Sequence, residues 1–451
     1  MTLLLYLAVP TICQKNAVLL AASLFFYAYG EPVYVILLIF SALANWLLAL
    51  GISAGNHRRG LLILSAAVNL GLLGVFKYSG FLVFWVNKAL RTEYPVPGIT
   101  LPIGISFYTF QALSYVIDVY RGECRAQRSF TRLLLYIACF PQLIAGPIVR
   151  YRDIEAALTD RRVTADGMAS GIRRFLFGLS KKVLIANYCG IITDTIYAAL
   201  PSEMSSSAAW LAAFAFFLQI YFDFSGYSDM AIGLGRMFGF TYLENFNYPY
   251  MAASVRDFWR RWHISLSTWL KEYLYIPLGG NRKGELRTAC NKMIVFLCCG
   301  IWHGASVTFL FWGFYYGLLQ LLEQFLPVFR SKPVTVFGKT FSHLYTIIAV
   351  LIGFVFFRAD TLSQGMQMLG CMFRFAPPSN AEAVSLLWSV LTPRAAAALV
   401  IGTVACFPIR NIFCRKKYYE FAVSCCSLLL GAVCILDLAG GTYNPFLYFR
   451  F

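Results

Sequence analysis

Residues 207–235 read SAAWLAAFAFFLQIYFDFSGYSDMAIGLG, an apolar run long enough to cross a membrane that nevertheless carries Asp223 and Asp229. Ionisable groups are expensive inside a bilayer, so a chain that keeps them in its apolar runs commonly uses some of them. More arginines, aromatic residues and a histidine follow before residue 284, and His303 comes shortly after. We therefore look for the function between residues 221 and 303.

The composition indicates an all-α membrane protein with many crossings. Of 451 residues, 59% are hydrophobic and only 13% are charged, which gives more apolar surface than one soluble core can bury. Because a crossing takes about 20 residues, the apolar runs predict roughly ten to twelve helices, some of them half-crossings. The runs are residues 2–13, 16–30, 32–53, 60–78, 102–120, 169–200, 207–235, 290–302, 306–327, 342–357, 395–409 and 420–438.

The net charge of +17 follows from membrane topology. A basic chain can bind nucleic acid, but here the lysines and arginines fall between apolar runs, as the positive-inside rule predicts, so we expect no nucleic-acid partner. If the basic loops 56–59, 121–132 and 150–162 are cytoplasmic, the N-terminus lies outside. The first run lacks the basic leader of a signal peptide and is expected to remain as a short helix.

Residues 136–149, YIACFPQLIAGPIV, do not fit a simple membrane helix. Two prolines and a glycine interrupt fourteen residues. Proline removes a backbone donor and breaks helices, and irregular backbone survives at membrane depth only when it is buried in protein or lines a watery cavity. We expect a broken or re-entrant element here.

Residues 254–275, SVRDFWRRWHISLSTWLKEYLY, are predicted to form one amphipathic helix. At 100° per residue, one arc holds Trp259, Trp262, Leu266, Trp269 and Tyr273. A neighbouring polar arc holds Arg256, Arg260, Ser267 and Lys271, with His263 on the border between the two arcs. Two interpretations stay open: an interfacial helix with aromatic anchors and snorkelling arginines, or a helix at a cytoplasmic mouth with His263 facing a polar cavity.

Of the four histidines, His303 is the best candidate for chemistry. His57 belongs to a basic loop and His343 begins an apolar run, so both are most simply interfacial. His303 lies in CGIWHGAS, residues 299–306, between two apolar segments whose small residues allow close approach. A buried, neutral imidazole is suited to take a proton from a hydroxyl, although a packed, hydrogen-bonded histidine is nearly as good an interpretation.

A polar seam is predicted along residues 226–236, where Gly226, Asp229, Gly233 and Arg236 recur at helical spacing. Asp223, Tyr227 and Asn247 are assigned to the same polar set. An ion pair between Asp229 and an arginine is favoured over a direct catalytic role. No G-x-S-x-G, H-E-x-x-H, Walker or C-x-x-C motif occurs, so neither those enzyme classes nor a metal site is indicated.

At these residues the chain resembles the membrane-bound O-acyltransferase family, and within it the alginate O-acetyltransferase-like branch that modifies polysaccharides. The matching stretches cover nearly the whole chain and are highly specific. They are residues 101–120, 140–150, 221–250, 256–284, 291–317, 357–359 and 446–451.

The resemblance implies one membrane domain over residues 1–451, with a motif core at 207–320 and re-entrant elements at 136–149 and 254–278. The implied fold has about eleven membrane helices around a central funnel. The family's signature histidine maps onto His303 at the base of that funnel. Its second histidine, in the R-W-H-x-S-L-S motif, maps onto His263. We expect the cavity around His303 to open toward both faces of the membrane.

The implied activity is transfer of an acyl group, most simply acetyl, from a cytoplasmic thioester toward a hydroxyl of an extracytoplasmic polysaccharide. The donor is acetyl-CoA or a phosphopantetheine-carried acyl group, with no tightly bound cofactor. His303 would be the general base or transient acyl carrier, and His263 or a nearby amide or indole would steady the oxyanion. The residues assigned to donor binding are Arg256, Trp259, Arg260, Trp262, Ser267, Asn281, Arg282 and Trp302.

The expected partners are a periplasmic or extracellular acetyltransferase or a small relay protein, with the polymer reached indirectly. The expected location is the inner membrane of a bacterium. Two alternatives remain. One is D-alanyl or other acyl transfer from a carrier protein to a cell-wall polymer, although PLGGNR at residues 277–282 resembles the acetylating branch. The other is a transporter or flippase, although the sequence lacks the paired broken helices usual in transporters.

Overall fold

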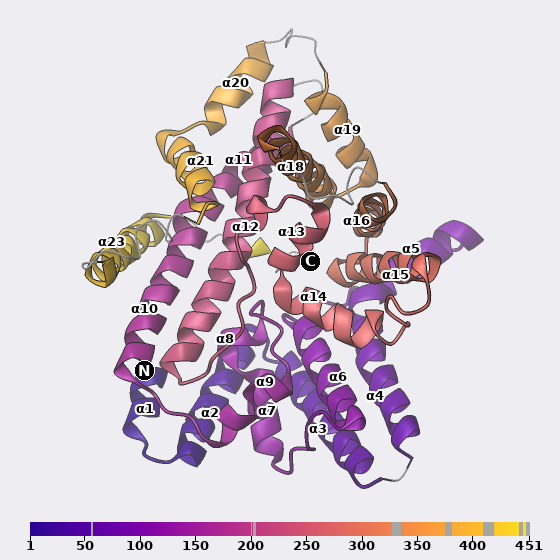
Figure 1. The fold of residues 1–451 in the computed structure, drawn as a ribbon, viewed down its shortest axis with the longest axis vertical. Coiled ribbons are helices and arrows are strands. Elements are labelled where there is room, and N and C mark those ends of the chain that lie inside the picture. The colour runs from indigo at the N-terminus through magenta and orange to yellow at the C-terminus, as the bar shows by residue number, and fades with distance from the viewer. Residues whose placement is uncertain are drawn as a thin grey trace. The chain divides into compact units, whose positions relative to one another are not determined.

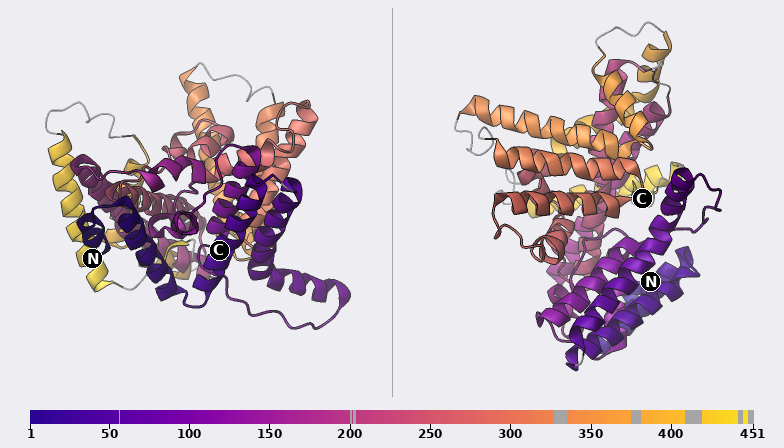
Figure 2. Two further views of the ribbon diagram at one scale, coloured as in Figure 1. Left: turned by 90° about the horizontal axis from the view of Figure 1, so that it is seen from below. Right: turned by 90° about the vertical axis from the view of Figure 1, so that its right-hand side faces the viewer.

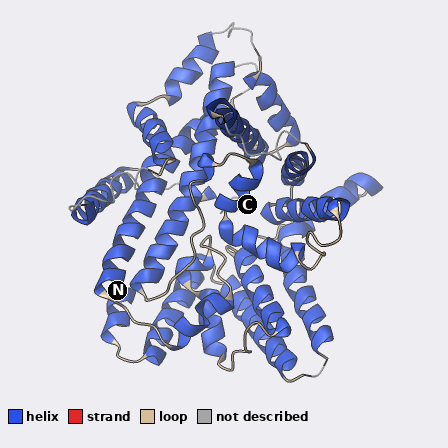
Figure 3. Ribbon diagram, in the orientation of Figure 1, coloured by secondary structure: helices blue, strands red, loops and turns tan. Residues whose placement is uncertain are grey.

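The computed structural model describes residues 1–55, 57–199, 201, 204–326, 335–374, 381–408, 419–441 and 445–447. Within these ranges the regular elements are helices, and Figure 3 shows no strand among them. Each of the twelve predicted apolar runs coincides with helix, which confirms the all-α class. Residue 56, the predicted run ends at 200, 327 and 409, and the closing residues 448–451 lie outside the described residues.

The chain divides into two compact units, with boundaries inside α10, inside α12 and between Glu244 and Asn245. Figure 1 labels α10 and α12. The first unit comprises Met1–Phe175 and Met230–Glu244, and the second comprises Leu176–Asp229 and Asn245–Phe451. The expectation of a single membrane domain over the whole chain stays a prediction.

The first unit contains the helices before the boundary in α10. Their bounds are α1 Thr2–Ala8, α2 Ile12–Gly30, α3 Tyr34–Ser53, α4 Arg58–Leu73, α5 Ser79–Leu90, α6 Ile105–Arg121, α7 Phe130–Ala138, α8 Phe140–Leu143, α9 Tyr151–Thr159 and α10 Ala165–Ser180. A π-helical turn at Gly74–Tyr78 makes α4 and α5 one continuous helix.

Helix α6 is buried along almost its whole length. In the helix pair α3 and α4, Asn45 exchanges side-chain hydrogen bonds with Asn69 and accepts one from Ser65. These buried amides therefore satisfy one another, as polar groups in an apolar core must.

The predicted break at residues 136–149 is confirmed. Helix α7 ends at Ala138, and the short α8 begins after Cys139 with Pro141 in its first turn. The backbone groups released by the break find partners inside the protein: the Gln142 side chain donates to the Tyr136 carbonyl at 2.7 Å, and the Tyr136 hydroxyl donates to the Val149 carbonyl at 2.9 Å. Internal partners of this kind make irregular backbone tolerable away from water.

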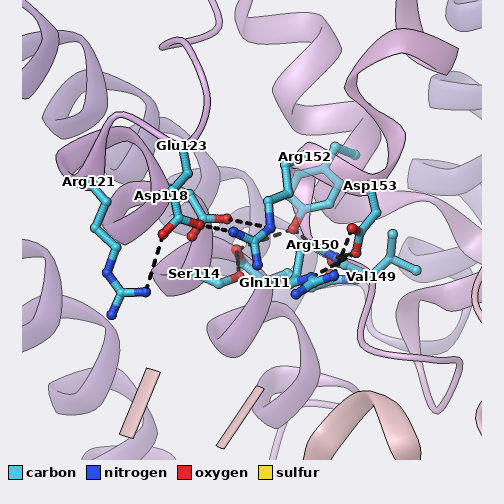
Figure 4. A network of polar contacts seen from close by, with 10 residues as sticks. Gln111, Ser114, Asp118, Arg121, Glu123, Val149, Arg150, Arg152 and Asp153 are labelled. Carbon is cyan, nitrogen blue, oxygen red and sulfur yellow. Dashed lines mark hydrogen bonds and ion pairs between the residues drawn. The ribbon is translucent and has the colours of Figure 1, made fainter. Parts of the chain in front are cut away.

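Charged residues join the start of α9 to the end of α6 (Figure 4). Arg152 pairs with Glu123 and lies 3.8 Å from the carboxylate of buried Asp118. Arg150 forms a 2.9 Å pair with Asp153 at the N-terminus of α9. The two basic loops that sequence analysis placed on one side of the membrane are thus linked by opposite charges and do not repel each other.

The second unit contains the remaining helices, together with α10 from Leu176 on, whereas α12 from Met230 on belongs to the first unit. The remaining helices are α11 Asn187–Ala198, α12 Ser206–Met237, α13 Val255–Arg261, α14 Ile264–Leu270, α15 Glu285–His303, α16 Val307–Phe325, α18 Val336–Arg358, α19 Leu362–Met372, α20 Ala381–Val390, α21 Pro393–Ala405 and α23 Tyr419–Gly440, with π-helical turns at Lys181–Ala186 and Lys271–Tyr275 and a 3-10 turn at Pro249–Met251. Helices α15, α16 and α18 lie side by side (Figure 2).

Glycines set the spacing between α15 and α16. A Cβ atom added to Gly300 would lie 2.3 Å from the Phe309 carbonyl oxygen, and one added to Gly313 would lie 2.4 Å from the Phe296 carbonyl oxygen. Because both contacts are with backbone, neither can be relieved by turning a side chain. The close approach holds the C-terminal end of α15, and with it His303, against α16.

Among the described residues, six helical segments are long and apolar enough to cross a membrane. They are Tyr34–Ser53, Arg58–Leu90, Ala165–Ala198, Ser206–Met237, Val336–Arg358 and Tyr419–Gly440. The count of about eleven crossings stays a prediction.

Candidate active site

His303 is the last residue of α15 and is 6% exposed. Its ring meets the edges of two aromatic rings, with centroids 5.1 Å from Trp312 and 5.1 Å from Phe357. Helix α15 ends here because Gly304 is extended, and a Cβ atom on Gly304 would lie 2.3 Å from the Phe309 ring. The sequence CGIWHGAS therefore ends a helix with an imidazole held in an aromatic cage.

His263 does not lie within a continuous helix, and the prediction of one helix over residues 254–275 is wrong. Helix α13 ends at Arg261 and α14 begins at Ile264, with His263 between them in the left-handed conformation, φ +43°. The two predicted arcs are therefore interrupted in the middle. The break is stabilised by a segment remote in sequence, because the Ile264 amide donates to the Asn245 carbonyl at 2.9 Å.

Asn245 organises this break, and sequence analysis missed it. Its Oδ1 accepts from the Ser265 amide at 3.1 Å and the Ser265 hydroxyl at 2.9 Å, and it lies 3.2 Å from Nδ1 of His263. Its amide nitrogen donates to the Ser228 hydroxyl at 3.1 Å. Asn247, which sequence analysis chose instead, is exposed. Nothing in the sequence separates the two asparagines, because only the fold shows which of them reaches His263.

His263 is held as a neutral ring. It is 1% exposed, and burial lowers its pKa to about 3. Since Asn245 Oδ1 also accepts from Ser265, Nδ1 of His263 carries the proton of the neutral ring and donates it to that oxygen. The Phe224 ring packs edge to face on the imidazole at 4.6 Å. Trp302 is buried between the two histidines, with its ring 4.9 Å from His303 and 6.2 Å from His263.

A small cavity adjoins His303 within the second unit. Its lining includes Asp223 and Trp262, two of the predicted residues, so the fold brings them to the same place as His303. The other lining residues are Ile220, Phe224, Trp312, Phe354, Phe357 and Leu447. The cavity measures about 10 Å³, which is about the room that one water needs. The chamber measured at His303 is thus small, because aromatic side chains fill its surroundings, and the expected opening toward both faces of the membrane stays a prediction.

Asp223 is one half of a buried ion pair with Lys182, which sequence analysis overlooked. The lysine Nζ lies 2.6 Å from Oδ1, and the two side chains are 8% and 2% exposed. The other carboxylate oxygen accepts the Leu447 amide at 2.9 Å, and Lys182 donates to the Pro445 carbonyl at 3.0 Å. The pair therefore holds residues 445–447 against the wall of the His303 chamber.

The other residues of the predicted polar seam make separate contacts that stabilise the fold. Asp229 pairs at 2.6 Å with Lys181, and the expected pair with an arginine stays a prediction. Arg236 lies 3.9 Å from Glu244, near solvent. A Cβ atom on Gly226 would meet the Gly178 carbonyl oxygen at 2.7 Å, so this glycine serves close helix packing. Tyr227 packs edge to face on the Phe446 ring at 5.0 Å.

A second, larger cavity of about 420 Å³ lies among α13, α14, α15 and α16. Among the described residues, its lining contains four cations and no carboxylate: Arg256, Arg260, Lys271 and Lys292. It also contains the predicted residues Trp259 and Ser267, whereas the predicted Asn281 and Arg282 are exposed and line neither cavity.

The larger cavity reaches close to His303. Cys299 lines it and precedes His303 by four residues on α15, which is a rise of about 6 Å. Trp259 lines the larger cavity, Trp312 lines the small chamber, and their ring centroids are 5.7 Å apart. The cationic cavity and the chamber at His303 are thus neighbours, with the indole rings of Trp259 and Trp312 between them.

No group of three or more histidine, cysteine or acidic side chains in the described part of the chain could hold a metal ion. His57 is exposed, and His343 lies 3.0 Å from the Ala252 carbonyl oxygen. Neither lines the two cavities.

Comparison with known proteins places this geometry in a family. Residues 125–361 match the profile of the membrane-bound O-acyltransferase family. The chain is 38% identical to a probable alginate O-acetylase of Pseudomonas putida, covering 97% of this chain and 94% of the relative. It is 36% identical to a peptidoglycan O-acetyltransferase of Helicobacter pylori over 78% and 72%, and 28% identical to a teichoic acid D-alanyltransferase of Bacillus subtilis over 59% and 69%. The chain therefore belongs to the membrane-bound O-acyltransferase family and is a multi-pass membrane acyltransferase.

Proposed function

We propose that this protein moves an acetyl group from a cytoplasmic thioester toward a hydroxyl of an extracytoplasmic polysaccharide in the inner membrane of a bacterium. The observation that carries the proposal is the contact between the cationic cavity and the His303 chamber through Trp259 and Trp312. The relatives act, by their names, on alginate, peptidoglycan and teichoic acid. A polysaccharide acceptor is therefore the simplest choice for this chain.

The larger cavity suits the phosphate-bearing arm of an acyl donor. Arg256 and Arg260 are exposed on α13, and Lys271 and Lys292 complete the cationic lining. Arginine forks pair well with phosphate oxygens, and lysine adds a point charge. The volume of about 420 Å³ lies in the lower half of the range for small-molecule pockets. It therefore suits a pantetheine arm with its phosphates at the mouth, whether the arm belongs to acetyl-CoA or to a carrier protein.

The chamber beside His303 suits a small acyl group. Its room for about one water is closer to the size of an acetyl group than to that of a longer chain. In the reaction His303 takes the proton of the acceptor hydroxyl while the hydroxyl oxygen attacks the thioester carbonyl carbon. The carbon–sulfur bond then breaks, and the leaving thiolate takes up a proton. His263 acts indirectly. Together with Asn245, it fixes the loop between α13 and α14.

The acceptor is expected to receive the group through a partner, either a small relay protein or an extracytoplasmic acetyltransferase. A partner would let the reaction occur at membrane depth although the polymer stays outside. The transporter alternative has no support among the named relatives, which are transferring enzymes.

The test is transfer from labelled acetyl-CoA by the protein in liposomes, comparing wild type with His303→Ala. General-base catalysis contributes about 10²- to 10⁴-fold, so we expect a loss of that size with normal membrane insertion. His57→Asn is the matched control, because His57 is exposed, lies in the other unit, and has φ +50°, which asparagine tolerates. Full activity of a properly inserted His303→Ala protein would refute the mechanism.

A second candidate, D-alanyl or other acyl transfer from a carrier protein, is favoured by the similarity to the Bacillus subtilis D-alanyltransferase. Supplying a D-alanyl-charged carrier in the same liposomes separates the two donors. Discharge of the carrier with no loss of label from acetyl-CoA would replace acetyl transfer by this activity.

A further inference from the structure

Trp312 is a buried polar side chain that the proposed mechanism has not yet used. It lies on α16 and is 1% exposed. Its indole Nε1–H meets no hydrogen-bond acceptor within the described ranges of the chain. Buried donors in native proteins are almost always bonded, and the exceptions concentrate where a ligand or a reacting group supplies the partner. Trp312 lines the chamber beside His303, so a bound group could supply that partner.

The position of this indole is fixed by its neighbours. Its ring centroid is 5.1 Å from His303 at 84°, 5.1 Å from Tyr316 and 5.7 Å from Trp259. Edge-to-face contacts on several sides leave the ring little freedom to rotate. A donor that is already oriented needs no reorganisation when charge develops next to it, which is the condition for electrostatic catalysis.

His263, the other expected donor, cannot serve in this role. Its neutral ring has one proton, and that proton is on Nδ1, facing Asn245 Oδ1 at 3.2 Å. Nε2 therefore has a lone pair and no hydrogen to donate. Two indoles line the chamber together with the imidazole of His303, those of Trp262 and Trp312, and of these two it is Trp312 whose buried Nε1–H meets no acceptor in the described part of the chain.

We propose that Trp312 is a catalytic residue whose Nε1–H donates a hydrogen bond to the carbonyl oxygen of the acyl group as that oxygen becomes an oxyanion. When the acceptor oxygen bonds to the carbonyl carbon, the π electrons of the carbonyl move onto this oxygen, and the indole stabilises them without giving up its proton. When the carbon–sulfur bond breaks, the electrons return to the carbonyl. The inference rests on the proposed acyl transfer at His303.

The experiment replaces Trp312 by 3-benzothienylalanine, which keeps the shape of the indole and exchanges its N–H for sulfur. Removal of one oxyanion donor costs about 10²- to 10³-fold in kcat. We expect a loss of that size with an unchanged KM for acetyl-CoA and an unchanged melting temperature, because no hydrogen bond within the protein is lost.

Trp210 is the matched control. Its Nε1–H donates to the Met372 carbonyl at 2.8 Å, away from both cavities. The same replacement there should lower the melting temperature and leave kcat per folded molecule unchanged. A Trp312 analogue that keeps wild-type kcat, or that loses kcat only together with folding stability, would overturn the assignment.

A spectroscopic arm separates this inference from the proposed function. Acetyl-CoA labelled with ¹³C at the carbonyl is bound to the His303→Ala protein, and the carbonyl stretch is measured by isotope-edited infrared spectroscopy. A shift to lower frequency that disappears on adding the Trp312 analogue supports the hydrogen bond. Absence of that difference refutes the role of Trp312 even if wild type transfers acetyl. Conversely, a shift in the His303→Ala protein together with no transfer by wild type refutes the function and leaves the hydrogen bond from Trp312 standing.

Discussion

Breaking the ion pair between Lys182 and Asp223 should strongly destabilise the second unit. The side chains are 8% and 2% exposed and their charged atoms are 2.6 Å apart, so removing either charge leaves the other buried without its counter-ion. Such a change typically costs about 3–5 kcal/mol. At 1.4 kcal/mol for each factor of ten, Lys182→Met or Asp223→Asn should lower the ratio of folded to unfolded protein by about 10²- to 10⁴-fold.

The double variant is the informative one. Replacing a whole buried pair by neutral groups of similar size is often close to neutral. Asparagine at position 223 keeps an oxygen for the Leu447 amide, which lies 2.9 Å from the carboxylate. We therefore expect the double variant to recover most of the stability lost by either single variant, giving a coupling energy of several kcal/mol.

The assay is denaturant unfolding in detergent, followed by tryptophan fluorescence. The exposed pair of Arg174 and Glu244 is the control, since surface pairs contribute about 0–1 kcal/mol. Strictly additive losses in the Lys182 and Asp223 variants would refute the reasoning, because they would show that the two charges do not stabilise each other. Acetyl transfer by the refolded double variant also reports on chemistry: full activity would limit Asp223 to holding the chamber wall.

Two further predictions concern the geometry around the histidines. Gly300→Ala should greatly reduce activity and cost about 1–3 kcal/mol of stability, because the new Cβ atom would press on the Phe309 carbonyl oxygen at 2.3 Å. Gly370→Ala is the control, because nothing lies within 4 Å of a Cβ atom there. This control should be harmless in the same transfer and unfolding assays. His263 has its pKa lowered to about 3, so its contribution to stability is complete above its unfolded pKa of about 6.5 and is lost as the pH falls toward 3. Wild type should therefore lose about 2 kcal/mol more than His263→Asn between pH 7 and pH 5, and equal pH slopes would contradict a buried, neutral His263.

Sequence reasoning succeeded where the signal is local. Apolar runs of about 20 residues predict helices because length and hydropathy are properties of a single segment. The break at residues 136–149 was predicted because proline acts on its own backbone. The burial of His303 was predicted for a similar reason, since apolar residues flank it on both sides, and its side chain is buried; its depth in the membrane stays a prediction.

It failed where distant segments decide the structure. Helical periodicity predicts a continuous helix through His263, but Asn245, eighteen residues earlier, takes the Ile264 amide and ends the helix. Sequence analysis likewise missed Lys181, forty-eight residues before Asp229 in the chain, which lies 2.6 Å from its carboxylate. Periodicity carries no information about which remote side chain reaches a given position.

The contacts in the structure also distinguish two groups among the charged residues of 221–284. Asp223 and Asp229 lie in apolar helix, and each is matched by a lysine at 2.6 Å, so their cost at membrane depth is offset inside the protein. Arg256 and Arg260 line a cavity whose described lining holds no carboxylate, so an anionic group that entered it would meet their charge. The two groups look equally unusual in the sequence. Only the contacts show that the two acids are paired inside the protein whereas the arginines line a cavity, and this difference is why we assign donor binding to the arginines and not to the acids.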